Sequence, residues 1–102
     1  MPNGACRLKL KWTKRALQQL KDAQAYIARD NPAAARDVAA LIAQATRLLL
    51  IQPQLGRTGR VKGTREWVVK QTPYLLAYTF ENDTVQILCV IHSKQDWPQA
   101  FD

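Results

Sequence analysis

Apolar and polar side chains alternate from residue 6 to residue 12, and a period of two is typical of a half-buried β-strand. The cations on its polar side suit an edge strand that resists pairing with other chains, although a stripe for contacting nucleic acid is the alternative. The apolar positions are Cys6, Leu8, Leu10 and Trp12, and the cationic ones are Arg7, Lys9 and Lys11.

The period changes to that of an α-helix after Thr13, a residue type that caps helix N-termini well. Residues 14–29 carry an apolar stripe along one face, which predicts an amphipathic helix of about four turns. Asn31 and Pro32 predict the start of a second, alanine-rich helix that ends at Gln52 and Pro53. Because the connection is short, we expect an antiparallel helical hairpin with closely approaching helices.

Three strands are predicted after the hairpin, over residues 65–70, 74–80 and 84–92. The last is apolar at nearly every position, so we expect it to be central and covered on both faces. The order β-α-α-β-β-β indicates an α+β fold, with the helical hairpin packed on one face of a small, mostly antiparallel sheet. The other face is expected to offer apolar residues to a partner, namely Leu75, Ala77, Leu88 and Val90.

The composition indicates one globular domain over residues 1–102, with a flexible N-terminus (1–5) and a C-terminal tail (93–102). Fifteen Lys and Arg against eight Asp and Glu leave a net charge of +7, which favours anionic partners. We find no segment apolar enough for a membrane span or a signal peptide, so we expect a cytoplasmic protein without a membrane partner. Cys6 and Cys89 are expected to be reduced and buried.

Signatures of phosphate-binding loops, zinc sites and hydrolases are absent from the sequence, so we expect no metal and no cofactor. A basic group around the glycine-rich segment 53–64 remains as a candidate site for phosphate or another target, because glycine lets backbone approach a ligand closely. A solvated loop is the simpler interpretation. The candidate contact residues are Arg57, Arg60, Lys62, Arg65, Lys94 and Trp97.

Between roughly residues 8 and 98 the chain resembles toxins of the RelE/ParE superfamily, the toxic halves of type II toxin–antitoxin modules. The resemblance implies a βααβββ toxin held inactive by a cognate antitoxin whose flexible, acidic segment wraps it. Operator DNA would then be contacted only indirectly, through the antitoxin. The features that carry the resemblance are the strand 8–13, the helix segment 25–30, the loop 56–66, Thr72-Pro73-Tyr74 with Tyr78, and the ending 90–98.

Two activities divide this superfamily. ParE-like members poison DNA gyrase by protein contact and are not enzymes, whereas RelE-like members cut messenger RNA on the ribosome. The Arg65-Glu66 run and the Ile91-His92 ending look more like the ParE branch, and no tyrosine follows His92. For the RelE alternative the catalytic candidates are Arg65, Lys70 and His92, with His92 as a general acid or base. The simpler interpretation is that His92 has a structural role and is hydrogen-bonded to the tail. A degenerate, non-toxic member that acts only in the antitoxin complex is a further alternative.

Overall fold

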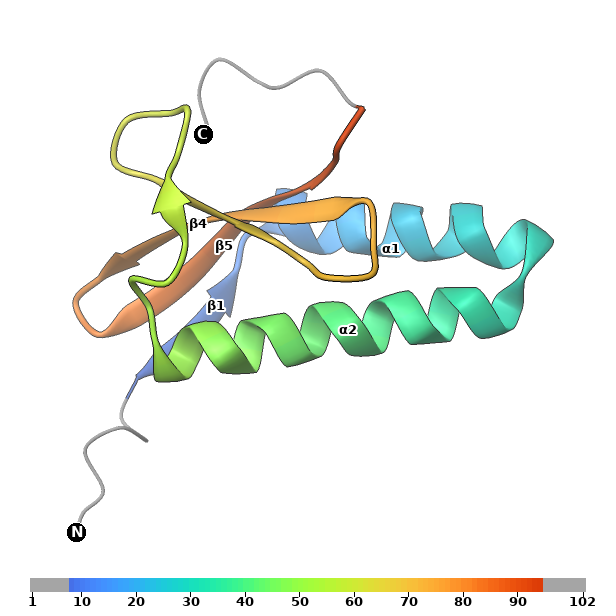
Figure 1. The fold of residues 1–102 in the computed structure, drawn as a ribbon, viewed down its shortest axis with the longest axis horizontal. Coiled ribbons are helices and arrows are strands. Elements are labelled where there is room, and N and C mark those ends of the chain that lie inside the picture. Colours follow the sequence, from blue (N-terminus) through green and yellow to red (C-terminus); the bar gives the residue numbers. More distant parts are fainter. Residues whose placement is uncertain (1–7, 95–102) are drawn as a thin grey trace, which may run out of the picture.

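The computed structural model describes residues 8–94, in which two helices pack against a five-stranded mixed sheet (Figure 1). The strand order is β1-β5-β4-β3-β2; β1 is parallel to β5, and the other pairs are antiparallel. The predicted α+β fold is therefore confirmed. The predictions for residues 1–5, Cys6, Arg7, Trp97 and most of the tail lie outside the described residues. In chain order the elements are β1 (Lys9–Trp12), α1 (Lys14–Asp30), α2 (Pro32–Ile51), β2 (Arg57–Thr58), β3 (Arg65–Val68), β4 (Tyr74–Glu81) and β5 (Thr84–His92).

Local capping sets both helix starts where the sequence predicts them. The side-chain oxygen of Thr13 accepts a hydrogen bond from the Ala16 N–H at 3.1 Å, and that of Asn31 accepts one from the Ala34 N–H at 3.1 Å. Pro32 occupies the first turn of α2, where its missing N–H is harmless. Both predicted helices are thus confirmed, and α1 runs one residue further than expected.

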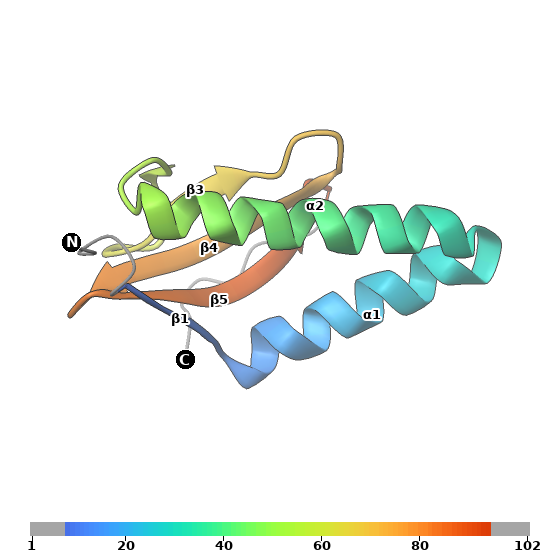
Figure 2. The ribbon, with the colours of Figure 1, turned by 90° about the horizontal axis from the view of Figure 1, so that it is seen from below.

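The helical hairpin covers one face of the sheet, and its tip extends beyond the strands (Figures 1 and 2). Between the two layers lies the main core, where each fully buried aliphatic or aromatic side chain contributes about 1.5–3 kcal/mol. Leu10 and Trp12 of β1 pack against this core, while Lys9 and Lys11 point to solvent, as the alternation predicts. The largest side chains of the core are Ile42, Leu49, Leu76, Tyr78 and Ile87.

A smaller cluster of buried residues lies on the face away from the hairpin. Leu75 and Ala77 belong to it, and half-buried Leu88 packs against it. Val90 instead joins the main core, so its predicted place on this face is wrong. The reason is a register shift: Ala77 pairs with Cys89 but Tyr78 pairs with Ile87. One extra residue in β5 reverses the alternation beyond it, because side chains change face with a period of two.

Two strand predictions need correction. The predicted strand 65–70 ends at Val68, and the chain turns there, with the Val69 N–H bonded to the Tyr74 carbonyl at 3.0 Å. Within the predicted loop 53–64, Arg57 and Thr58 form β2, a short strand paired with the start of β3. Two polar residues are too few to show a period of two. A strand of this length depends on pairing with its neighbour, here β3, rather than on its own sequence.

The two edges of the sheet differ. Beyond the end of β1, the first turns of α1 close the edge of β5. The Thr13 hydroxyl donates to the Leu88 carbonyl at 3.2 Å, and the Gln19 side-chain oxygen accepts from the Val90 N–H at 2.8 Å. At the opposite edge, β2 pairs only with the first two residues of β3. Beyond β2, Trp67 and Val68 of β3 form the edge of the sheet. Among residues 8–94 no helix is long and apolar enough to cross a membrane.

Candidate functional site

The segment 57–65, which we name the basic loop, leaves α2 through a connection anchored on the sheet. The Tyr78 hydroxyl donates to the Pro53 carbonyl at 2.8 Å and accepts from the Gly56 N–H at 2.9 Å. Arg65 adds hydrogen bonds from its guanidinium to the carbonyls of Gly56 and Gln54, at 2.8 and 3.2 Å. Position 56 needs glycine, because a Cβ there would lie 2.5 Å from the Tyr78 oxygen. Burial raises the pKa of Tyr78 and keeps this hydroxyl protonated.

The tip of the basic loop closes on itself through Thr64, which is almost fully buried. The Gly59 N–H bonds the Thr64 carbonyl at 2.8 Å, and the Thr64 N–H and hydroxyl both donate to the Val61 carbonyl, at 3.1 and 2.6 Å. Gly63 takes a φ of 82°, which other residues rarely adopt. The loop therefore has a defined backbone rather than a loose one.

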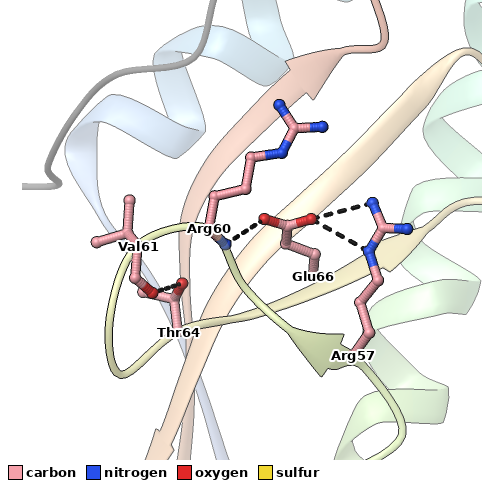
Figure 3. A network of polar contacts seen from close by, with 5 residues as sticks. All are labelled: Arg57, Arg60, Val61, Thr64 and Glu66. Atoms are coloured by element: carbon pink, nitrogen blue, oxygen red, sulfur yellow. Dashed lines mark hydrogen bonds and ion pairs between the residues drawn. The ribbon is translucent and has the colours of Figure 1, made fainter.

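Glu66 holds the same loop from the side of β3. One carboxylate oxygen accepts from Nε and Nη2 of Arg57, at 3.2 and 3.1 Å, and the other accepts from the backbone N–H of Arg60 at 2.8 Å (Figure 3). Glu66 is only 3 % exposed, so without these partners its carboxylate oxygens would be buried and unsatisfied. The guanidinium of Arg60 points away from Glu66 (Figure 3).

The residues of the predicted basic group have different surroundings in the structure. Arg57 and Arg65 are held by Glu66 and by backbone carbonyls. Arg60 and Lys62 are exposed on the loop. Lys94 comes after the end of β5, seven residues along the chain from Ile87, which is level with Arg65, so it does not join them. Trp97 lies outside the described residues.

The three nuclease candidates do not come together. Arg65 is level with Tyr78 of β4 and Ile87 of β5, whereas His92 pairs with Tyr74. Since strands rise about 3.3 Å per residue, the five steps from Ile87 to His92 span about 16 Å. Lys70 follows β3 on the edge of the sheet, across β4 from His92.

His92 has the contacts of a structural residue. Its Nδ1 accepts a hydrogen bond from the Lys94 N–H at 3.1 Å, and its ring meets that of Tyr74 edge-on at 5.3 Å between centroids. The bond to Lys94 agrees with the interpretation of His92 as a structural residue that is hydrogen-bonded to the tail.

A second surface, which the sequence analysis missed, is an apolar groove of about 470 Å³ between α2 and β3. We name it the α2–β3 groove. Ile51 is 69 % exposed and Leu48 is 37 % exposed at its wall. The sequence held a signal for it: four consecutive aliphatic residues at 48–51 cannot all face the core, because a helix turns about 100° per residue. The residues that line it are Leu41, Gln44, Ala45, Arg47, Leu48, Ile51, Trp67, Val69 and Lys70.

Comparison with known proteins places these features in a family. Residues 10–97 match the family model described as the ParE toxin of the type II toxin–antitoxin system, parDE. Over 95 residues the chain is 45 % identical to "Putative toxin Y4kP" of Sinorhizobium fredii (strain NBRC 101917 / NGR234), covering 93 % of this chain and 98 % of that protein.

The fold resembles a chain from the structure titled "Chromosomal ParDE TA system from P. aeruginosa". The TM-score is 0.75, and the match covers 83 % of this chain and 95 % of that chain at 23 % identity. At that identity the likeness concerns the fold. The family match and the 45 % identical relative carry the assignment: this chain belongs to the ParE toxin family of type II toxin–antitoxin systems.

Proposed function

We propose that this chain inhibits DNA gyrase by direct contact and that a cognate antitoxin neutralises it by binding the α2–β3 groove. The observation that carries the proposal is the family match over residues 10–97, which includes both the basic loop and the groove. Gyrase inhibition was the activity expected for the ParE branch. Because gyrase works on chromosomal and plasmid DNA, the proposal also assigns the chain to the cytoplasm.

The basic loop is the proposed contact for the gyrase–DNA complex. It combines a backbone held by hydrogen bonds with the exposed cations Arg60 and Lys62, on a chain of net charge +7. Such an arrangement suits phosphates or an acidic protein surface, because the cations are presented without ordering the loop at the moment of binding.

Messenger RNA cleavage has less support. A nuclease must stabilise charge and move two protons at one phosphate, so its groups must converge. Arg65 is committed to two carbonyls and lies several residues along the sheet from His92. We therefore propose a non-enzymatic toxin.

The α2–β3 groove suits an acidic amphipathic segment of the antitoxin. Its apolar side chains would bury one face of such a segment, and Arg47 and Lys70 among the lining residues would pair with acidic side chains beside that face. The antitoxin contact first expected from the sequence is less accessible. Leu75, Ala77 and Val90 are 6, 0 and 3 % exposed, and Leu88 is half-buried.

The test is a supercoiling assay with purified gyrase from the same host, relaxed plasmid and ATP. We expect loss of supercoiling with accumulation of cleaved plasmid, and recovery when the neighbouring gene's antitoxin is added first. A variant with Arg60→Ala and Lys62→Ala serves as the loop control. Uninhibited gyrase at a molar excess of this protein would overturn the proposal, and the same preparation would then be assayed for mRNA cleavage on translating ribosomes.

A further inference from the structure

Glu66 is an ionisable side chain in an unusual place. Across the strands it pairs with Ala77, which belongs to the small apolar cluster on the face away from the hairpin. Directly opposite residues of an antiparallel pair share a face, so the carboxylate lies next to apolar neighbours at 3 % exposure. A buried carboxylate is costly unless charged or N–H partners surround it, and Glu66 has such partners on both oxygens.

Within residues 8–94, the hydrogen bonds that this carboxylate accepts come from the basic loop. Arg57 belongs to β2, and the Arg60 N–H belongs to the turn that follows. Glu66 therefore joins the strand entering the loop, the loop itself and the strand leaving it. Tyr78 and Thr64 hold other points of the same segment, so removal of Glu66 leaves those anchors in place.

The charge of the loop is also divided by Glu66. It neutralises Arg57, whose side chain is 61 % exposed, at an Nη2–Oε1 distance of 3.1 Å. Its other oxygen accepts from the backbone N–H of Arg60 at 2.8 Å (Figure 3). With Arg57 paired in this way, Lys62 stands exposed near the tip of the loop.

We infer that Glu66 is a positioning residue of the toxin: it fixes the loop backbone at Arg60 and thereby sets the direction in which the tip of the loop meets the target. This inference rests on the proposed function, because it takes the basic loop as the contact with gyrase. It goes beyond that function in assigning the loop geometry to one buried acidic residue that touches no target itself.

The test compares Glu66→Ala with Glu81→Ala, a matched change at an exposed glutamate of β4. Hydrogen exchange of the full chain reports on the loop, and the supercoiling assay reports on inhibition. In Glu66→Ala we expect the Arg60 amide to exchange about 10- to 100-fold faster, since a hydrogen bond to a charged group is lost. We expect amides at Tyr78 and Ile87 to keep their protection and half-maximal inhibition to need roughly tenfold more protein. Glu81→Ala should behave as the unaltered chain.

Two further variants grade the effect and remain informative if Glu66→Ala does not fold. Arg57→Ala changes an exposed side chain and leaves the Arg60–Glu66 bond, so its exchange at Arg60 should rise less. Glu66→Gln keeps one acceptor oxygen for the Arg60 N–H and should fall between Glu66→Ala and the unaltered chain. A loss of protection across the whole sheet, rather than in the loop, would reduce Glu66 to a residue of general stability.

The inference is overturned if Arg60 keeps its protection in Glu66→Ala, or if the loop opens while inhibition of gyrase stays at the unaltered level. Failure of the proposed function is a separate result, visible when the unaltered chain does not inhibit gyrase. The exchange measurement then still decides whether Glu66 holds the loop.

Discussion

The basic loop and the α2–β3 groove are built in opposite ways. Polar contacts define the loop: buried Glu66 and Thr64 and the Tyr78 hydroxyl hold its backbone while the cations of its tip face water. The groove instead exposes apolar side chains such as Leu48 and Ile51. The basic loop is ordered before a partner binds. The groove exposes apolar surface, and its burial by a partner would be favourable.

The two surfaces should therefore respond to mutation on different scales. Full burial of an aliphatic side chain contributes about 1.5–3 kcal/mol, whereas an exposed ion pair contributes about 0–1 kcal/mol. We expect the groove to dominate affinity for the antitoxin. The loop should act mainly through its geometry, with each exposed cation adding little.

The largest effect is expected from Leu48→Asp in the groove. Binding of the antitoxin would remove water from the groove, so a charge introduced there should weaken antitoxin binding about 100-fold or more. Leu17→Asp on α1 is the control, because Leu17 is 42 % exposed and Leu48 is 37 % exposed, yet Leu17 does not line the groove. Isothermal titration of both variants with purified antitoxin measures the difference. Equal losses in the two would remove the groove from the antitoxin interface.

Next in size is the effect of Tyr78→Phe on the anchor of the loop. The change leaves the Gly56 N–H and the Pro53 carbonyl without their buried partner, so the free energy of unfolding should fall by about 1–3 kcal/mol. Tyr26→Phe, at a residue that is 70 % exposed, should stay within about 0.5 kcal/mol. Urea unfolding followed by circular dichroism compares the two. A Tyr78→Phe protein as stable as the unaltered chain would show that water replaces the hydroxyl at no cost.

A smaller effect is expected from alkaline pH. Burial raises the pKa of Tyr78 in the folded chain, so the folded state favours the protonated phenol. Its contribution to stability is complete below the unfolded pKa of about 10 and is lost as pH rises through the folded value. As pH rises above about 10, the free energy of unfolding should therefore fall more steeply in the unaltered chain than in the Tyr78→Phe variant. The raised pKa values of Tyr74 and Cys89 act in both proteins and cancel in the comparison. Parallel pH profiles of urea midpoints would contradict the role of Tyr78.

The smallest effects are expected from the cations at the tip of the loop. Arg60→Ala and Lys62→Ala should each raise the half-maximal inhibitory concentration for gyrase by about two- to fivefold at low salt, and by less at high salt, because exposed charges are screened. Lys21→Ala, an exposed cation on α1, is the control. A loss of several hundredfold from either single change would mean that the loop contacts its target through a desolvated charge rather than by shape.

Much of the fold was predictable because its signals are local. Thr13 and Asn31 cap the helices within a few residues of themselves, and Pro32 acts on its own turn. The strand of Leu10 and Trp12 follows from alternation alone. The short β2 had no such signal, and the place of Val90 depends on a one-residue shift that neither β4 nor β5 reveals by its composition.

The candidate site was predictable in part. The sequence indicated a basic group around segment 53–64, but Glu66 entered only as part of the Arg65-Glu66 run, whereas in the structure this residue is the centre of the loop. It also grouped Arg65, Lys70 and His92, which lie at different places on the sheet. Closeness along the chain says little about closeness in space when strands separate the residues.

By itself, then, the sequence determined the order of the elements, the ends of the helices and the family to which the chain belongs, because these depend on contacts within a turn or on an extended match. The tertiary structure alone decided that Arg57 and Arg65 are held by Glu66 and by backbone carbonyls, and where apolar surface stays exposed. Those properties depend on the register of β3 against β2 and β4 and on the packing of α2. Such pairings join residues far apart in sequence, and local propensities do not encode them.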